Sequence, residues 1–219
     1  MARGMEEVAE LLERHYRHLA IPEVEGTWEQ ACLILLNHGT KQDRVKSGML
    51  RNTLLEFPAD VESASLAELA EAVEQFKAPE KIAATLKKLA PWWSENISPD
   101  DGADGHSTEE LQQQLMALPG INRELADRLL LLVFGRAVVP LERGLLRIGV
   151  RHGWLDTSAD YEEWQSFFVR GCENAGVELI PLLTHLRQVG KEFCGPQPKC
   201  TACPLQTLLP PSGPYELDG

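Results

Sequence analysis

The run from Leu118 to Ala126, which reads Leu-Pro-Gly-Ile-Asn-Arg-Glu-Leu-Ala, constrains the fold more than any other part of this chain. Leucines recur at helical spacing on both sides of it, at Leu111 and Leu115 before it and at Leu125 and Leu129 after it. The Pro-Gly pair therefore predicts a short connection between two amphipathic helices rather than a turn between strands. Such a connection exposes N–H groups at the start of the second helix, where they and the helix dipole suit a phosphate oxygen. An ordinary helical hairpin is the alternative, because short connections between helices are common.

Helix signals recur along the whole chain, and no segment has the alternation of apolar and polar residues that marks a half-buried strand. The polar stretch 97–106 indicates a loop before the hairpin, and the stretch 5–19 indicates an amphipathic helix. We expect further helices to begin at three capping boxes and at one proline in the first helical position. These signals are Thr27 with Gln30, Ser65 with Glu68, Ser107 with Glu110, and Pro79. The sequence thus predicts an all-α fold.

The chain is acidic, with a formal net charge of −12. That balance opposes binding to nucleic acid, because affinity for DNA comes largely from neutralising phosphates. The stretch 120–151 is locally basic, since its six arginines outnumber Glu124, Asp127 and Glu142 and give a local balance of +3. We expect salt-sensitive binding of nucleic acid through this stretch, or, as the alternative, a solvated helix face with no partner.

No apolar run in the sequence is long enough to span a membrane, and the acidic N-terminal segment lacks the features of a signal peptide. We therefore expect a cytoplasmic protein, associated with the nucleoid if it is bacterial. Three of the five cysteines, Cys194, Cys200 and Cys203, lie within ten residues of one another. This arrangement favours a metal or cluster site over a disulfide framework. Cys32 lies in an apolar helical run and is expected to be a core residue.

The hairpin, the segment after it and the cysteine run follow one another in a specific order. The middle segment has Phe134 and Gly135 followed by Glu142 and Arg147. Taken together, this order resembles the endonuclease III branch of the helix-hairpin-helix DNA glycosylases, the HhH-GPD superfamily. The resemblance extends from about residue 28 to residue 209. It implies base excision repair on double-stranded damaged DNA by a monomer, without membrane contact.

The resemblance also implies the domain organisation. Two helical domains with a cleft between them are expected. One is a helical barrel domain, 23–135, which carries the helix-hairpin-helix motif. The other is discontinuous, since it combines 1–22 with 136–219 and carries the C-terminal cysteine loop of the iron-sulfur type.

The expected catalytic positions depart from the family pattern. The resemblance places Glu124 where bifunctional members have a lysine nucleophile, and a carboxylate cannot form a Schiff base. It places Glu142 where the family has an aspartate across the cleft, which keeps the charge on a side chain one methylene longer. We therefore expect a glycosylase that removes a damaged base through Glu142 without lysine-dependent AP-lyase chemistry. The alternative is a catalytically degenerate DNA-binding or interaction module on the same scaffold.

The residues expected to contact DNA are also implied by the resemblance. Asn122 replaces the second glycine of the hairpin, and we expect it to adopt the left-handed conformation that asparagine tolerates. His38 or Gly39 aligns with a glutamine that wedges into the duplex, and histidine could fill that space. The full set of expected DNA-binding residues is Gly120, Asn122, Arg123, Ala126, His38, Gly39 and Arg147.

The spacing of Cys194, Cys200 and Cys203 resembles the ligand loop for a 4Fe-4S cluster in this family. Leu209 stands where the fourth cysteine would be, so the fourth ligand must come from elsewhere or the loop holds only reduced thiols. Cys172 and His185 are the two donors considered, and neither matches the motif. Zinc held by three cysteines and a histidine is the chemical alternative.

Overall fold

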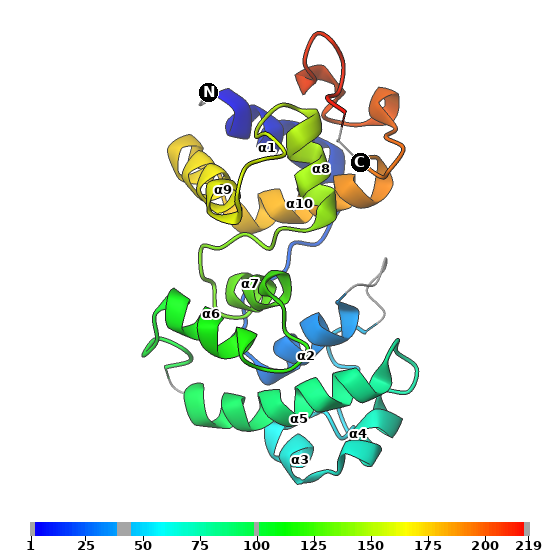
Figure 1. Ribbon diagram of the computed structural model, residues 1–219, viewed down its shortest axis with the longest axis vertical. Coiled ribbons are helices and arrows are strands. Elements are labelled where there is room, and N and C mark those ends of the chain that lie inside the picture. The colour runs from blue at the N-terminus through cyan, green and yellow to red at the C-terminus, as the bar shows by residue number, and fades with distance from the viewer. Residues whose placement is uncertain (1–2, 39–44, 99–100, 217–219) are drawn as a thin grey trace. The chain divides into compact units, whose positions relative to one another are not determined.

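The computed structural model describes residues 3–38, 45–98 and 101–216, and within them it contains helices and loops but no β-strand (Figure 1). Two isolated bridges, Ser98 with Gly102 and Cys194 with Pro198, are the only β-type pairs described. The helices are α1 (Arg3–Tyr16), α2 (Trp28–Asn37), α3 (Pro58–Ser63), α4 (Leu66–Ala72), α5 (Pro79–Asn96), α6 (Thr108–Met116), α7 (Arg123–Leu132), α8 (Arg143–Arg151), α9 (Tyr161–Ala175), α10 (Leu179–Glu192) and the 3-10 helices η1 (Cys200–Ala202) and η2 (Gln206–Leu208). The all-α prediction is confirmed. None of these helices combines the length and the apolar character that crossing a membrane requires.

The chain divides into two compact units, and each is described by itself. Residues 24–136 form the first, which we call the hairpin unit. Residues 1–23 and 137–219 form the second, the cysteine unit. These bounds differ by one residue at each junction from the division expected from the sequence. In the cysteine unit, α1 packs against α9 and α10, so the N-terminal segment belongs with the C-terminal one.

Most of the predicted helix starts are present. Ser65 and Ser107 each accept from an N–H group three residues on, and the glutamate at that position accepts from the backbone of the capping residue in return. Pro79 begins α5 as expected. The box at Thr27 is only half formed, because the Gln30 side chain accepts from Glu25 N instead. A further box, Asp160 with Glu163, begins α9 and was not predicted.

The leucines that predicted the two hairpin helices form the core between them. Leu111 and Leu115 of α6 and Leu125 and Leu129 of α7 are buried almost completely, and α6 packs against α7. Helix α5 packs against α3 and α4 on one side and against α2 on another. Helix α2 in turn packs against α7, so the N-terminal half of the hairpin unit contacts a helix that carries the turn.

In the cysteine unit, α8 and α10 cross at two glycines. A Cβ atom on Gly144 would lie 3.3 Å from the Cα of Gly190, so the two backbones meet without side chains between them. The close crossing brings the N-terminal end of α8, where Glu142 lies, next to α10, which carries Arg187.

Candidate functional site

The hairpin turn between α6 and α7 requires glycine at position 120. Gly120 has φ of +82°, which lies in the left-handed region that favours glycine. A Cβ atom there would also collide with Oγ1 of Thr85, whose hydroxyl donates to the Pro119 carbonyl at 2.7 Å. Pro119 and Gly120 are exposed, whereas Ile121 is buried and anchors the turn. The turn therefore presents backbone on the surface in a fixed conformation.

Asn122 caps the second hairpin helix. Its φ of −87° and ψ of 174° are extended, so the expected left-handed conformation is wrong. The Asn122 side chain instead accepts from Leu125 N at 2.9 Å, and asparagine is among the strongest N-cap residues. The reason for asparagine at this position is thus a hydrogen bond and not its tolerance of positive φ.

Two other residues of this helix were expected to contact DNA. Ala126 is completely buried, and its N–H donates to the Asn122 carbonyl at 2.9 Å. Its side chain is therefore not exposed in this structure, and its expected DNA contact stays a prediction. Arg123, at the first helical position, is half-buried.

The structure brings Glu124 and His38 together. The Glu124 carboxylate lies 3.1 Å from Nη2 of Arg128, one turn along α7, and 4.0 Å from Nδ1 of His38. The Arg128 side chain is buried, with 6% of its surface exposed, whereas the Glu124 side chain keeps 29%. The position expected for a nucleophile is therefore occupied by a carboxylate that neutralises a buried arginine.

His38 lies directly after α2, whose last residue, Asn37, bonds to Val45. Asn37 is buried, and its side-chain amide donates to the Val45 carbonyl at 2.8 Å while its oxygen accepts from Val45 N at 3.1 Å. These two bonds join the C-terminal end of α2 to Val45. Gly39, the other residue expected at the wedge, lies outside the described residues.

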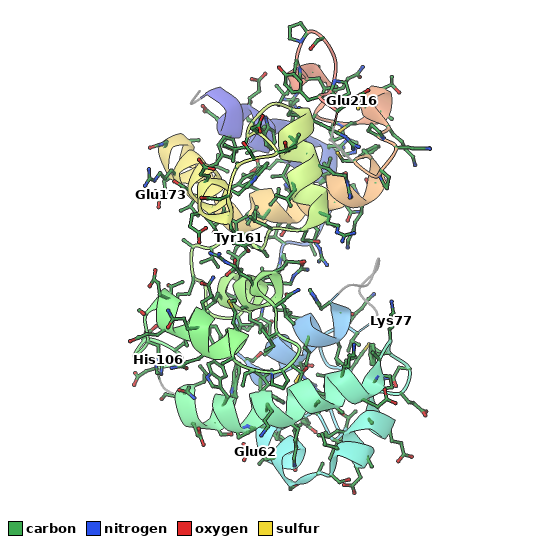
Figure 2. The ribbon with its side chains drawn as sticks, viewed as in Figure 1. Glu62, Lys77, His106, Tyr161, Glu173 and Glu216 are labelled. Atoms are coloured by element: carbon green, nitrogen blue, oxygen red, sulfur yellow. The ribbon has the colours of Figure 1, made fainter. Side chains whose placement is uncertain are left out.

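Most arginines of the locally basic stretch have internal partners. Arg136 donates to the carbonyls of Ala103 and His106, the latter labelled in Figure 2. Arg147 donates through Nε to the Cys194 carbonyl at 2.7 Å. With Arg128 and Arg151, at least four of the six arginines have partners inside their own units in the described part of the chain. Their N–H groups are therefore partly used inside the protein, although hydrogen bonds to carbonyls leave the positive charge in place.

Glu142 lies at the N-cap of α8 and makes no side-chain cap bond. Its Oε1 lies 3.2 Å from Nε of Arg187, and about a quarter of each side chain is exposed. Glu142 belongs to the cysteine unit and Glu124 to the hairpin unit. The expectation that the two carboxylates share one cleft therefore stays a prediction.

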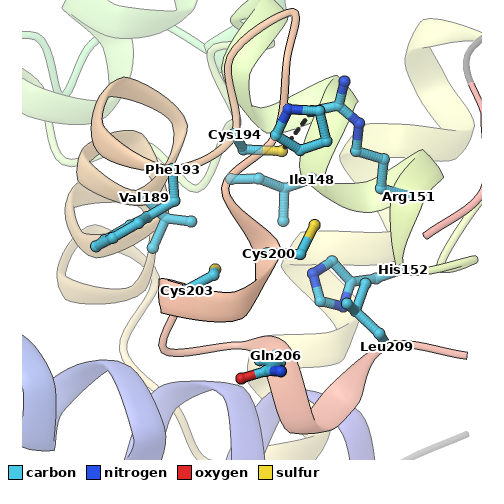
Figure 3. Close-up of a pocket in the computed structure, with 11 residues that line it drawn as sticks. Ile148, Arg151, His152, Val189, Phe193, Cys194, Cys200, Cys203, Gln206 and Leu209 are labelled. Atoms are coloured by element: carbon cyan, nitrogen blue, oxygen red, sulfur yellow. Dashed lines mark hydrogen bonds between the residues drawn. The ribbon is translucent and has the colours of Figure 1, made fainter. Parts of the chain in front are cut away.

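The three C-terminal cysteines turn toward one pocket. Figure 3 shows their side chains between the C-terminal ends of α8 and α10 and the loop that carries η1 and η2. Cys194 is buried and Cys200 and Cys203 are half-buried. Burial raises the pKa of the Cys203 thiol, a hydrogen bond from the backbone at Leu205 opposes this, and the charges of Cys194 and Cys200 add to the rise. Burial and the two neighbouring sulfurs therefore disfavour the thiolate form of Cys203.

Arg151 is buried beside this pocket. Its guanidinium donates to Cys194 Sγ at 3.2 Å, to the Gly195 carbonyl at 2.8 Å and to the Pro196 carbonyl at 3.0 Å. Arg147 and Arg151 are four residues apart on α8, so one face of this helix holds the cysteine loop. The spacing of these two arginines was the signal in the sequence that could have shown this contact.

The two residues that the sequence offered as a fourth ligand, His185 and Cys172, do not lie at the cysteine pocket. His185 is buried in α10, where its ring stacks on Tyr16, and Cys172 is buried in α9. Neither lines the cysteine pocket, but His152 and Leu209 both do. His152 was missed because no motif marks it. Within the described residues, no three His, Cys, Asp or Glu side chains are grouped closely enough to hold a single metal ion.

Comparisons with known proteins were made at the level of sequence and of structure. No family model matches the sequence. No curated protein sequence matches either. Solved structures do match, with low sequence identity but over nearly the whole chain.

Two of the matching structures are of endonuclease III with DNA. A trapped covalent endonuclease III–DNA intermediate has a TM-score of 0.71 at 16% identity, and the match covers 95% of each chain. A non-covalent endonuclease III–DNA complex has a TM-score of 0.72 at 17% identity, again over 95% of each chain. A thermostable thymine-DNA glycosylase has a TM-score of 0.61 at 14% identity, over 94% of this chain and 96% of the other.

The exposed Pro-Gly turn between α6 and α7 is the structural feature that this chain shares with helix-hairpin-helix folds. The matching structures are DNA glycosylases of the HhH-GPD superfamily. This chain has the endonuclease III fold. The resemblance expected from the sequence is thereby confirmed at the level of the fold.

Proposed function

We propose that this protein is a DNA glycosylase of the HhH-GPD type that removes a damaged base from double-stranded DNA. The observation that carries the proposal is the hairpin turn. Its exposed backbone at Pro119 and Gly120 is locked by Thr85 and is followed by the N-terminus of α7, in a chain with the endonuclease III fold. Backbone N–H groups at such a helix start suit a phosphate oxygen without a specific side chain.

Glu142 is the residue that we assign to chemistry. A carboxylate in its position can accept a proton from an attacking water molecule and stabilise the positive charge that develops on the sugar as the base leaves. The ion pair with Arg187 would hold the carboxylate in place. Because a shift of about 1 Å in a catalytic group can cost about 100-fold in rate, this restraint matters for the reaction.

The presence of a glutamate at position 124 favours a mechanism without a covalent enzyme intermediate. Its side chain cannot attack the sugar to form a Schiff base, and its contacts with Arg128 and His38 give it a different task. We assign His38 to the space left by a flipped base, with Glu124 holding the ring close to α7. Release of the base without cleavage of the strand is the expected outcome.

We also propose an iron-sulfur cluster as the occupant of the cysteine pocket. Three sulfurs turn toward one space, and Arg151 brings a buried positive charge to its edge, which fits an anionic thiolate centre. When bound, the cluster would cross-link the C-terminal loop to the end of α10. Arg147 and Arg151 also hold this loop, through hydrogen bonds from α8 to its carbonyl groups.

One observation favours a second function, a DNA-binding module without enzyme activity. Both carboxylates at the expected catalytic positions are already paired with an arginine, Glu124 with Arg128 and Glu142 with Arg187. Such a module would keep the hairpin turn and lose base release. The two functions are distinguished by base release, which a glycosylase should show and should lose in Glu142→Gln.

The test is a screen of DNA duplexes that each carry one damaged base, with the released base measured by chromatography. We expect release from at least one duplex and its loss in Glu142→Gln. Glu173→Gln, an exposed change in the same unit, is the matched control and should keep full activity. If no duplex loses its base while Gly120→Val still abolishes binding, the module is the correct function.

A borohydride-trapping arm run on the same duplexes examines the role of Glu124 separately. Borohydride reduces a Schiff base to a stable covalent link, so a lysine nucleophile would leave protein attached to DNA. We expect no covalent product from this chain. A trapped product would overturn the proposed reaction while leaving the glycosylase class intact.

A further inference from the structure

We infer that His152 is the fourth ligand of the cluster held by Cys194, Cys200 and Cys203. The inference rests on the cluster proposed above and does not depend on base excision. It assigns a role to a residue that belongs to no motif of the sequence, and it explains how the centre is completed where Leu209 replaces a cysteine. Four observations carry it.

The first observation is position. His152 follows α8 directly and lines the same pocket as the three cysteines. Figure 3 shows its ring beside the side chain of Cys200, with Leu209 next to it. Leu209 has no donor atom, so it contributes only apolar cover to the pocket. Among the described residues that line this pocket, His152 is the one histidine, and it lies beside the cysteines.

The second observation is the orientation of the ring. Nδ1 of His152 lies 3.3 Å from the carbonyl oxygen of Leu208. In a neutral imidazole this contact places the proton on Nδ1, as a donor to the carbonyl, and leaves the lone pair of Nε2 free to bind a metal. A metal-binding histidine usually donates its other ring N–H to a carbonyl or carboxylate in this way.

The third observation is charge. The Arg151 side chain is buried, with 7% of the residue exposed, and its bonds within the described part of the chain go to two carbonyls and to Cys194 Sγ, with no carboxylate among them. A buried arginine without an anion is costly. Three thiolates supply that anion. A neutral imidazole as the fourth ligand completes the centre without adding a further buried negative charge.

The fourth observation is the spread of the donors. A single zinc ion needs all its ligands within about 2.0–2.3 Å of one atom. No three donors in the described residues are grouped in that manner. A cluster distributes its protein ligands over several irons, so it suits sulfurs that line a pocket without converging on one point. A cluster with three cysteines and one histidine is therefore the occupant that the pocket favours.

The test uses the full chain purified without oxygen and three variants. His152→Ala removes the proposed ligand, and His152→Cys replaces it with the thiolate that other clusters of this kind use. His18→Ala, an exposed change in the same unit, is the matched control. Iron, acid-labile sulfide and zinc are measured for each protein, and circular dichroism shows whether each is folded.

We expect iron and sulfide in the wild type, in His18→Ala and in His152→Cys. In His152→Ala we expect iron affinity, measured by competition with a chelator, to fall by more than the roughly 10- to 100-fold that loss of an outer hydrogen-bond partner costs. The double variant His152→Ala with Leu209→Cys should recover the iron, because it places a thiolate in the same pocket.

Pulsed electron paramagnetic resonance of the reduced protein separates a ligand from a merely structural residue. With 15N-labelled histidine, the wild type should show nitrogen coupling to the cluster, and His152→Cys should lose the coupling while it keeps its iron. The same variant should have a lower reduction potential, since imidazole ligands raise the potential of a cluster.

Each outcome is decisive. Iron and sulfide in the wild type without nitrogen coupling would overturn the role of His152 and leave the cluster in place. Zinc, or no metal, in the anaerobic wild type would overturn both the cluster and its fourth ligand. Neither result bears on base release, which the glycosylase screen measures separately.

Discussion

Glu142 Oε1 lies 3.2 Å from Arg187 Nε, which joins the start of α8 to α10 at the place where the two helices cross on glycines. Residues 142 and 187 are far apart in the sequence, and the packing of α8 against α10 brings them together. The pair restrains the one carboxylate of the cysteine unit to which we assign chemistry.

The first prediction concerns the free energy of this pair. We expect a double-mutant cycle of Glu142→Gln and Arg187→Gln to give a coupling of about 0.2–1 kcal/mol, the range measured for exposed pairs. The measurement is urea unfolding of the four proteins at one salt concentration. A coupling of zero within error would show that the pair contributes nothing to stability in solution.

The second prediction concerns the hairpin turn. Gly120→Ala should destabilise the protein by more than about 1 kcal/mol, because a left-handed φ disfavours alanine and its Cβ would collide with Thr85. DNA affinity should fall with it. Gly105→Ala in the same unit is the control, since nothing lies within 4 Å of a Cβ atom there. Equal effects of the two changes, by thermal unfolding and a binding titration, would contradict this account of the turn.

The third prediction separates the cap at Asn122 from DNA binding. Asn122→Ala should cost about 1 kcal/mol of stability, the usual value for a lost N-cap. Asn122→Asp should keep the cap bond and the stability, but its negative charge at the start of α7 should repel a phosphate and weaken DNA binding. Asn122→Ser keeps both properties and serves as the control. If Asn122→Asp bound DNA as well as the wild type, phosphate would not lie at this helix start.

The fourth prediction concerns the reactivity of the cysteines. Burial raises the pKa of Cys172 to about 11, so at pH 8 only about one thiol in a thousand is a reactive thiolate. Burial also raises the pKa of Cys32 strongly. After treatment with a chelator, iodoacetamide should modify Cys200 and Cys203 first and leave these two unmodified. Peptide mass spectrometry after a timed reaction checks the order, and early labelling of Cys172 would contradict its burial.

Local patterns predicted the parts of this fold that local chemistry determines. The leucine spacing around Pro119 and Gly120 identified two helices and the turn, and two of the three expected capping boxes are formed. The asparagine at position 122 shows the limit of this reasoning, since its residue type fits both a left-handed turn and an N-cap. The extended backbone of Asn122 in the structure identifies it as an N-cap.

The contacts that make up the candidate site could not be read from the sequence. His38 and Glu124 meet because α2 packs against α7, and Arg151 reaches Cys194 across a separation of 43 residues. Such pairings depend on how helices pack, and no short motif encodes them. The histidine beside the cysteine pocket was missed for the same reason, while His185 and Cys172, which were considered, point into other cores.

The pairing of Glu124 with Arg128 also limits how this protein could change over evolutionary time. A lysine at position 124 would place two cations one helical turn apart on α7, and like charges at that spacing destabilise a helix. The ion pair between Arg128 and Glu124 would be lost in the same step. Glu124→Lys alone would therefore be expected to destabilise α7.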